Sequence, residues 1–129
     1  MQNKYKYYKL TTKEKEEITQ GIRRILVEDG RVLLALIYGS FIELDCFRDI
    51  DLAIYIPKYD LKTIFSIANK IEEEIGIPVD VIPIQEVDSK QKLHILRNGL
   101  ILLEQVPGLY EALIMQALDE LALISKYGN

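Results

Sequence analysis

Residues 35–55 read ALIYGSFIELDCFRDIDLAIY. The segment predicts a strand, a Gly-Ser turn, a short connection and a second strand that opens with two aspartates. Asp49 and Asp51 are separated by one residue, so both carboxylates point from the same face of that strand, because side chains alternate along it. Two adjacent carboxylates repel each other and together attract a hard divalent cation, usually Mg²⁺.

A Gly-Ser pair ends the first of these two strands. Gly39 lets backbone amides approach an anion closely, and the hydroxyl of Ser40 adds a hydrogen-bond donor. A group suited to phosphate beside a group suited to a metal ion indicates chemistry on a nucleoside triphosphate.

The two strands of this segment are predicted to be antiparallel. The first is the apolar run over residues 32–38, and the second covers residues 49–56. About ten residues connect them, which is too few for a parallel crossover with a full helix. The Gly-Ser pair is therefore expected at the same edge of the sheet as the two aspartates.

A third carboxylate is expected beside the first two. A helix over residues 60–75 leads to a third strand over residues 79–84, and such a connection favours a parallel, right-handed crossover. Parallel strands begin at the same edge of the sheet, so Asp80 is predicted to lie beside the other two aspartates. Pro83 indicates that this strand lies at an edge or contains a bulge.

These residues resemble the signature of the DNA polymerase beta-type nucleotidyltransferases. Gly39-Ser40, a spacer of eight residues, Asp49-Ile50-Asp51 and a third aspartate downstream carry the resemblance, which covers roughly residues 33–104. The size of the chain is similar to that of the minimal members, the MNT antitoxin-type proteins that are often encoded beside HEPN-domain partners. The resemblance implies an α/β (α+β) polymerase beta-like nucleotidyltransferase fold, with a small mixed sheet of about four strands flanked by helices.

The flanking helices complete this expected fold. Thr11 and Glu14 form a capping box at the start of a first helix, which Gly30 ends. Two later helices over residues 89–98 and 109–126 enclose a short peripheral strand over residues 100–105. The whole chain, residues 1–129, is expected to form a single domain with its core at about residues 33–105.

Composition argues against several classes of protein. A formal net charge of −4 and a pI near 5.1 argue against a broad nucleic-acid-binding surface. No apolar run is long enough to span a membrane, and the first ten residues do not resemble a signal peptide.

Cys46 is the only cysteine, so an internal disulfide is excluded and a cytoplasmic location is expected. We interpret Cys46 as a small packing residue and His94, the only histidine, as a surface or packing residue.

Two segments leave their roles open. The KYKYYK segment, residues 4–9, is either a contact arm for RNA or a partner, or a tail whose tyrosines pack on the body. The last helix has apolar residues on more than one stripe, so it is either deeply buried or offers a partner surface. We expect the partner surface, through the face that carries Leu113, Ala117 and Leu121, in a complex with a HEPN-like protein or with a second copy of the chain.

The resemblance also implies an activity. Asp49, Asp51 and Asp80 would hold two Mg²⁺ ions, while Gly39 and Ser40 would hold the β and γ phosphates of ATP. The reaction would move AMP from ATP to a hydroxyl of a HEPN-type toxin and release pyrophosphate, so the protein would act as an antitoxin. Asp80 could instead be the base that receives the proton of the hydroxyl.

The alternative function is a non-catalytic module with the same fold, which neutralises a partner protein by contact. A spacer shorter than the family's usual ten or so residues favours this alternative. So does Phe41, which stands where many relatives carry a basic residue. The intact set of three aspartates favours the enzyme.

Overall fold

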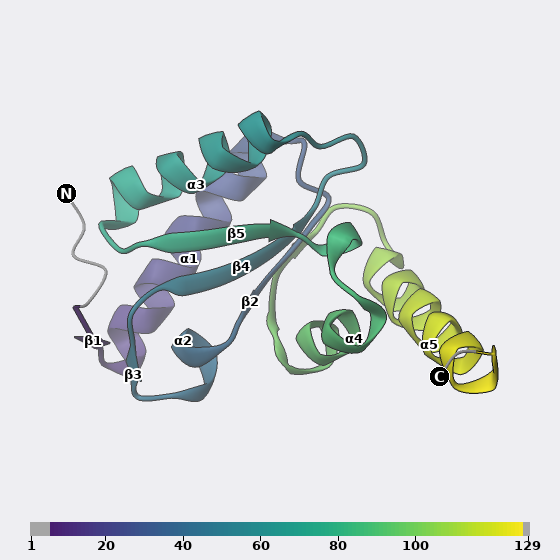
Figure 1. The fold of residues 1–129 in the computed structure, drawn as a ribbon. Helices are drawn as coiled ribbons and strands as arrows, with labels where there is room; N and C mark the ends of the chain where they lie inside the picture. The colour runs from purple at the N-terminus through teal and green to yellow at the C-terminus, as the bar shows by residue number, and fades with distance from the viewer. Residues whose placement is uncertain (1–5, 128–129) are drawn as a thin grey trace.

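A four-stranded mixed sheet forms the centre of the protein, seen in a computed structural model that describes residues 6–127 (Figure 1). The strand order is β5-β4-β2-β6. β2 pairs antiparallel with β4, and β4 pairs parallel with β5, as the short and long connections predict. β2 also pairs antiparallel with β6, a pairing that the sequence analysis does not address. The strands are β2 (Leu34–Tyr38), β4 (Ile50–Tyr55), β5 (Val79–Pro83) and β6 (Leu100–Glu104).

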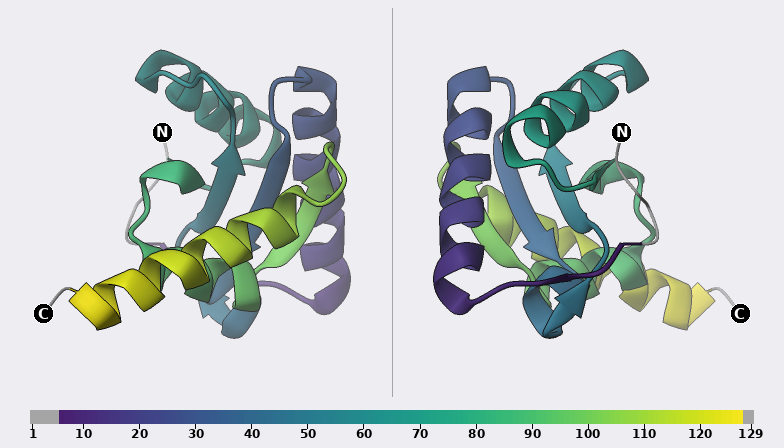
Figure 2. Two further views of the ribbon diagram at one scale, coloured as in Figure 1. Left: turned by 90° about the vertical axis from the view of Figure 1, so that its right-hand side faces the viewer. Right: turned by 90° about the vertical axis from the view of Figure 1, so that its left-hand side faces the viewer.

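Helices cover both faces of the sheet (Figure 2). α1 (Thr12–Asp29) and α3 (Leu61–Ile75) pack on one face, where their isoleucines meet alternate residues of the strands in the larger apolar cluster. α4 (Ser89–Asn98) and α5 (Leu109–Tyr127) lie on the other face over a smaller cluster. Burial on both faces explains why β2 is a continuous apolar run instead of an alternating one.

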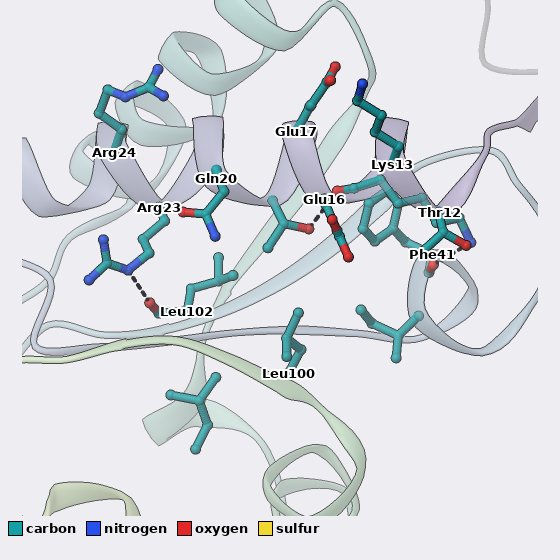
Figure 3. A pocket seen from close by; sticks show the side chains of 14 residues that line it. Thr12, Lys13, Glu16, Glu17, Gln20, Arg23, Arg24, Phe41, Leu100 and Leu102 are labelled. Carbon is teal, nitrogen blue, oxygen red and sulfur yellow. Dashed lines mark hydrogen bonds between the residues drawn. The ribbon is translucent and has the colours of Figure 1, made fainter.

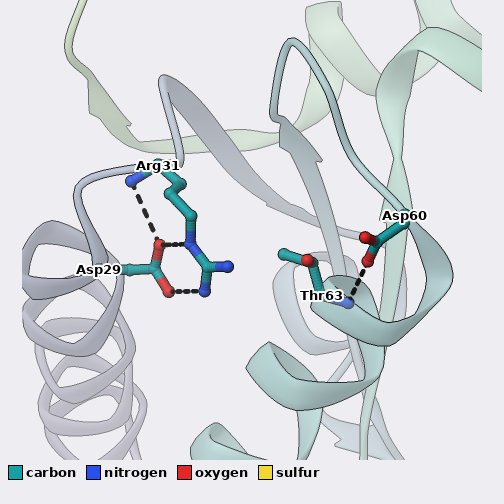
Figure 4. Close-up of polar contacts among 4 residues, drawn as sticks. All are labelled: Asp29, Arg31, Asp60 and Thr63. Atoms are coloured by element: carbon teal, nitrogen blue, oxygen red, sulfur yellow. Dashed lines mark hydrogen bonds and ion pairs between the residues drawn. The ribbon is translucent and has the colours of Figure 1, made fainter.

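The ends of α1 and α3 are fixed by side chains that satisfy free backbone groups. The backbone N–H of Glu14 donates to Thr11 Oγ1 over 3.1 Å, and the N–H of Thr11 donates to Glu14 Oε1 over 2.9 Å, which confirms the capping box. Asp60 accepts a hydrogen bond from the N–H of Thr63 over 2.7 Å and begins α3 (Figure 4).

β5 and β6 are the two edges of the sheet. Pro83 lies at the end of β5, which confirms the prediction that its strand is at an edge of the sheet. Proline has no N–H to donate, and an edge strand leaves one side of its backbone unpaired. A 3-10 turn, η1 (Ile84–Glu86), follows β5 and leads to α4.

The connection between β2 and β4 has more structure than the sequence predicts. It contains a four-residue helix, α2 (Ser40–Glu43), and a two-residue strand, β3 (Cys46–Phe47). β3 pairs antiparallel with β1 (Tyr8–Lys9), so the N-terminal segment lies against this connection. Part of the KYKYYK segment lies outside the described residues; in the described part, Tyr8 packs on the body by stacking on the ring of Phe47.

The predicted orientation of α5 is wrong. Leu113 is buried in the cluster that includes Ile95 and Leu96 of α4, Ala117 is fully buried, and Leu121 is half-buried, so this face is not a free surface. The hydroxyl of Tyr110 donates to the carbonyl of Leu96 over 2.6 Å and helps to fix the rotation of the helix. The C-terminal part of α5 projects away from the sheet (Figures 1 and 2), and Ile124 there is 52% exposed. In the described part of the chain, no helix has the length and apolar character needed to cross a membrane.

Candidate active site

Three neighbouring strands bring an acidic row to one end of the sheet, where β2 ends and β4 and β5 begin. Tyr38 of β2 is paired with Asp51 of β4, and Asp51 is paired in turn with Asp80 of β5. Paired residues point to the same face, so these three side chains lie in one line across the sheet. Asp49 precedes β4 by one residue and completes the set. The structure therefore brings together the three aspartates that the sequence predicts to converge.

Gly39 lies directly against this acidic row. Its φ angle is 79°, in the left-handed region that side chains disfavour. A Cβ atom at this position would lie 2.6 Å from Oδ2 of Asp51, closer than a Cβ atom approaches an oxygen to which it is not bonded. Glycine is thus required here both by the turn and by the aspartate, and the Gly-Ser turn contacts the acidic row.

Ser40 begins α2 just beyond this contact. The carbonyl of Gly39 accepts hydrogen bonds from the N–H groups of Ile42 (3.1 Å) and Glu43 (3.0 Å), which closes the first turn. The first N–H groups of a helix have no partner within the helix. Those of Ser40 and Phe41 therefore remain donors at the edge of the sheet that carries the aspartates.

The three carboxylates of the acidic row repel one another. Burial, and then the nearby negative charges of Asp49 and Asp80, together raise the pKa of Asp51 from 3.8 to about 6. Asp51 is half-buried, whereas the other two aspartates are exposed. Within residues 6–127, no Lys, Arg or His forms an ion pair with any of the three. An added cation would relieve this repulsion.

Tyr38 is a residue of the site that the sequence analysis missed. Its half-buried ring packs with the apolar cluster beneath α4 and α5. Burial raises its pKa well above the usual range, and the charges of Asp51, Asp80 and Asp49 add to the effect. Tyr38 therefore presents a neutral hydroxyl to the site at physiological pH. The strand alternation that places Asp51 could have predicted it, because Tyr38 immediately precedes the Gly-Ser pair.

The donor atoms of the row suit Mg²⁺, which prefers carboxylate oxygen. Among residues 6–127, however, no group of three His, Cys, Asp or Glu side chains is arranged to hold a metal ion by itself. Mg²⁺ commonly binds one or two carboxylates and takes its remaining ligands from phosphates and water. The aspartates thus fit an ion that is held jointly by the protein and a bound nucleotide.

The comparison with known proteins agrees with this geometry. Residues 20–107 match the family described as polymerase beta, nucleotidyltransferase. The chain belongs to this nucleotidyltransferase family. The matched range includes the Gly-Ser turn and all three aspartates. No curated protein matches the chain.

Solved structures of nucleotidyltransferase fold resemble the whole arrangement. A crystal structure of the toxin–antitoxin MntA–HepT has a TM-score of 0.69 at 15% identity, covering 86% of this chain and 91% of that chain. A toxin–antitoxin with AMP-PNP has a TM-score of 0.71 at 17% identity, with coverages of 84% and 90%. A tri-AMPylated HEPN toxin in complex with MNT antitoxin, from Shewanella oneidensis, gives 0.70 at 16% identity, with coverages of 87% and 91%. At these identities the likeness shows the shared fold.

Other candidate features of this nucleotidyltransferase lie apart from the acidic row. His94 is exposed on α4, and its Nδ1 lies 3.3 Å from Nδ2 of Asn98. Cys46 is exposed on β3, so the prediction that it is a packing residue is wrong. An open groove runs between α1, α2 and β6, where Arg23 Nε donates to the carbonyl of Leu102 over 3.0 Å (Figure 3). No aspartate lines this groove, so it is not the acidic site.

Proposed function

We propose that the protein is a Mg²⁺-dependent nucleotidyltransferase that transfers AMP from ATP to a hydroxyl group of a HEPN-type toxin, and so acts as an antitoxin. The observation that carries this proposal is the contact of Gly39 with the carboxylate of Asp51. It joins an element suited to phosphate with an element suited to a metal ion. The family supports the reaction class, and the similar complexes with AMP-PNP and with an AMPylated toxin support the nucleotide and the acceptor.

The residues of the chain have separate roles in this reaction. Backbone N–H groups after Gly39 and the hydroxyl of Ser40 hold the β and γ phosphates. Asp49 and Asp51, with Asp80 where it acts as a ligand, would hold Mg²⁺, which would neutralise charge on the triphosphate and lower the pKa of the attacking hydroxyl. The acceptor oxygen forms a bond to the α phosphorus, the bond from the α phosphorus to the bridging oxygen breaks, and pyrophosphate leaves with that electron pair.

The proton of the acceptor hydroxyl needs a base. Asp80 is exposed at the start of β5 and is open to an acceptor that approaches the sheet edge. It serves either as the third metal ligand or as the base. The roles of Asp49 and Asp51 as ligands are the same in both cases.

The exposed end of α5 is the partner surface in this proposal. Leu123 and Ile124 are more than half exposed there, and Met115 is 58% exposed on the outer side of the helix. Exposed apolar side chains grouped on one projecting helix are typical of protein interfaces. A helical toxin would cover them, as would a second copy of the chain.

The alternative function is neutralisation of a partner by contact alone. One observation favours it: the residue after Ser40 is a phenylalanine that is buried in the core with 1% exposure, and it supplies no cationic side chain to a triphosphate. Under this alternative the aspartates would have no part in neutralising the toxin.

Labelled ATP, MgCl₂ and the HEPN-type partner separate the two functions. The enzyme transfers label to the toxin, and Asp49→Asn abolishes transfer and protection from the toxin while still forming the complex. Asp45→Asn removes the same charge at an exposed aspartate of the β2–β4 connection and serves as the matched control. An Asp49→Asn protein that protects cells as well as wild type would exclude the enzymatic mechanism.

A further inference from the structure

Helix α2 is held by a lysine from a distant part of the chain. Lys15 of α1 donates from Nζ to the carbonyl of Phe41 over 2.8 Å and to the carbonyl of Leu44 over 2.9 Å. Carbonyls at the end of a helix have no intrahelical partner and carry partial negative charge. The ammonium group of Lys15 therefore caps the C-terminal end of α2.

The same ammonium group lies beside two buried aromatic rings. It is 5.4 Å from the ring centroid of Phe41 and 5.6 Å from that of Phe47, within the range of cation–π attraction. The two rings meet edge to face at 4.9 Å, and Tyr8 stacks on Phe47 at 5.6 Å. We call these four side chains the loop clamp.

The loop clamp holds both ends of the connection that carries the site. Phe41 directly follows Ser40, and Phe47 precedes Asp49 by two residues. Lys15 contacts both phenylalanines, so one cation joins the phosphate side of the connection to its acidic side. A movement of α2 would change the separation of Gly39 and the carboxylate of Asp51, which leaves no room for even a Cβ atom.

We propose that Lys15 is a positioning residue, which sets the Gly-Ser turn against Asp49 and Asp51 for binding of a nucleoside triphosphate. The inference rests on the proposed function. Lys15 does not reach the acidic row: its two hydrogen bonds go to backbone carbonyls of the connection, and burial and like charges alone shift the pKa of Asp51. It acts through the geometry of α2, and misplacement of a binding element by about 1 Å can reduce catalysis as much as a hundredfold.

Three variants test this role. Lys15→Met keeps the aliphatic stem but removes the donors and the charge. Lys15→Arg restores both. Lys13→Met removes the same charge from an exposed residue of the same helix, which extends away from Phe41 in Figure 3, and so controls for a general loss of positive charge.

Two measurements on the purified protein report the effect. Calorimetry with ATP and MgCl₂ gives the affinity, and amide hydrogen exchange of residues 40–44 gives the stability of α2. We expect Lys15→Met to melt within a few degrees of wild type, to bind ATP about tenfold more weakly and to exchange faster only in this segment. Lys15→Arg should recover most of the affinity, and Lys13→Met should match wild type.

The outcomes separate this inference from the proposed function. Wild type that binds no ATP would overturn the proposed function and the inference together. Wild-type binding with unchanged affinity in Lys15→Met would overturn the inference alone. Weaker binding without faster exchange at residues 40–44, or equal weakening in Lys13→Met, would show that Lys15 acts through its charge and not by holding α2.

Discussion

Replacement of Asp51 by asparagine should stabilise the protein at neutral pH. In the folded state the pKa of Asp51 rises from 3.8 to about 6, because the side chain is partly buried and faces two other carboxylates. A difference of about two pH units corresponds to about 3 kcal/mol. Asp51 is only half-buried, so solvent screening reduces this to about 1–1.5 kcal/mol. Asparagine keeps the size of the side chain and carries no charge, so it avoids this cost.

The effect has a defined pH dependence. The folded pKa of Asp51 is higher than the unfolded one, so the folded state binds the proton more tightly. The cost of ionisation is absent below about pH 4, grows as the pH rises to about 6, and is complete above about pH 7. Asp51→Asn and wild type should therefore have similar unfolding free energies at pH 4, and the variant should be the more stable one at pH 8.

Urea unfolding at both pH values, with a chelator present, measures the difference. Asp45→Asn is the control, because it removes a carboxylate from an exposed site in the same connection. MgCl₂ with ATP should then stabilise wild type and leave Asp51→Asn unaffected. An Asp51→Asn protein that is less stable than wild type at pH 8 would refute the reasoning, because it would mean that the carboxylate has a favourable partner in the folded state.

Three further changes test the rest of the structure. Asp49→Asn should abolish label transfer from ATP while leaving the melting temperature unchanged or slightly higher, since it removes one of three repelling charges; unchanged transfer would remove the metal-binding role. Gly39→Ala should displace the carboxylate of Asp51 and weaken ATP binding at least tenfold, at a cost of about 1–2 kcal/mol in unfolding free energy; wild-type affinity in the folded variant would place the triphosphate elsewhere. Ile124 is exposed, so Ile124→Glu should melt like wild type but prevent association in light scattering. Leu113 is buried, so Leu113→Ala should instead lose about 2–5 kcal/mol of stability. An unchanged assembly in Ile124→Glu would exclude the end of α5 as an interface.

The sheet and the acidic row could be predicted because their causes are local. A continuous apolar run predicts β2, and a connection too short for a parallel crossover predicts its antiparallel pairing with β4. The helix before β5 predicts parallel pairing, and parallel pairing places Asp80 beside Asp51. Each step needs only the spacing of residues along the chain.

The loop clamp and the rotation of α5 could not be predicted, because they depend on contacts between distant residues. Lys15 and Phe41 are 26 positions apart. In the sequence, Lys15 is one of several charged residues near the start of the first helix, and nothing distinguishes it from the others. In α5, apolar residues lie on several sides of the helix, so packing against neighbouring elements determines which face is buried. Tyr110 helps to make that choice through its hydrogen bond to α4, and nothing in the periodicity of α5 indicates it.

The short spacer by itself does not argue against catalysis. Tyr38 and Asp51 are paired neighbours, so the connection has to return only about 5 Å, the spacing between adjacent strands. Its residues are more numerous than this return requires, and they form α2 and β3 instead. Its length therefore leaves Gly39 free to reach Asp51, as the structure shows. The buried Phe41 is the stronger argument for the non-catalytic alternative, because it bears on the charge that meets a triphosphate and not on the reach of the chain.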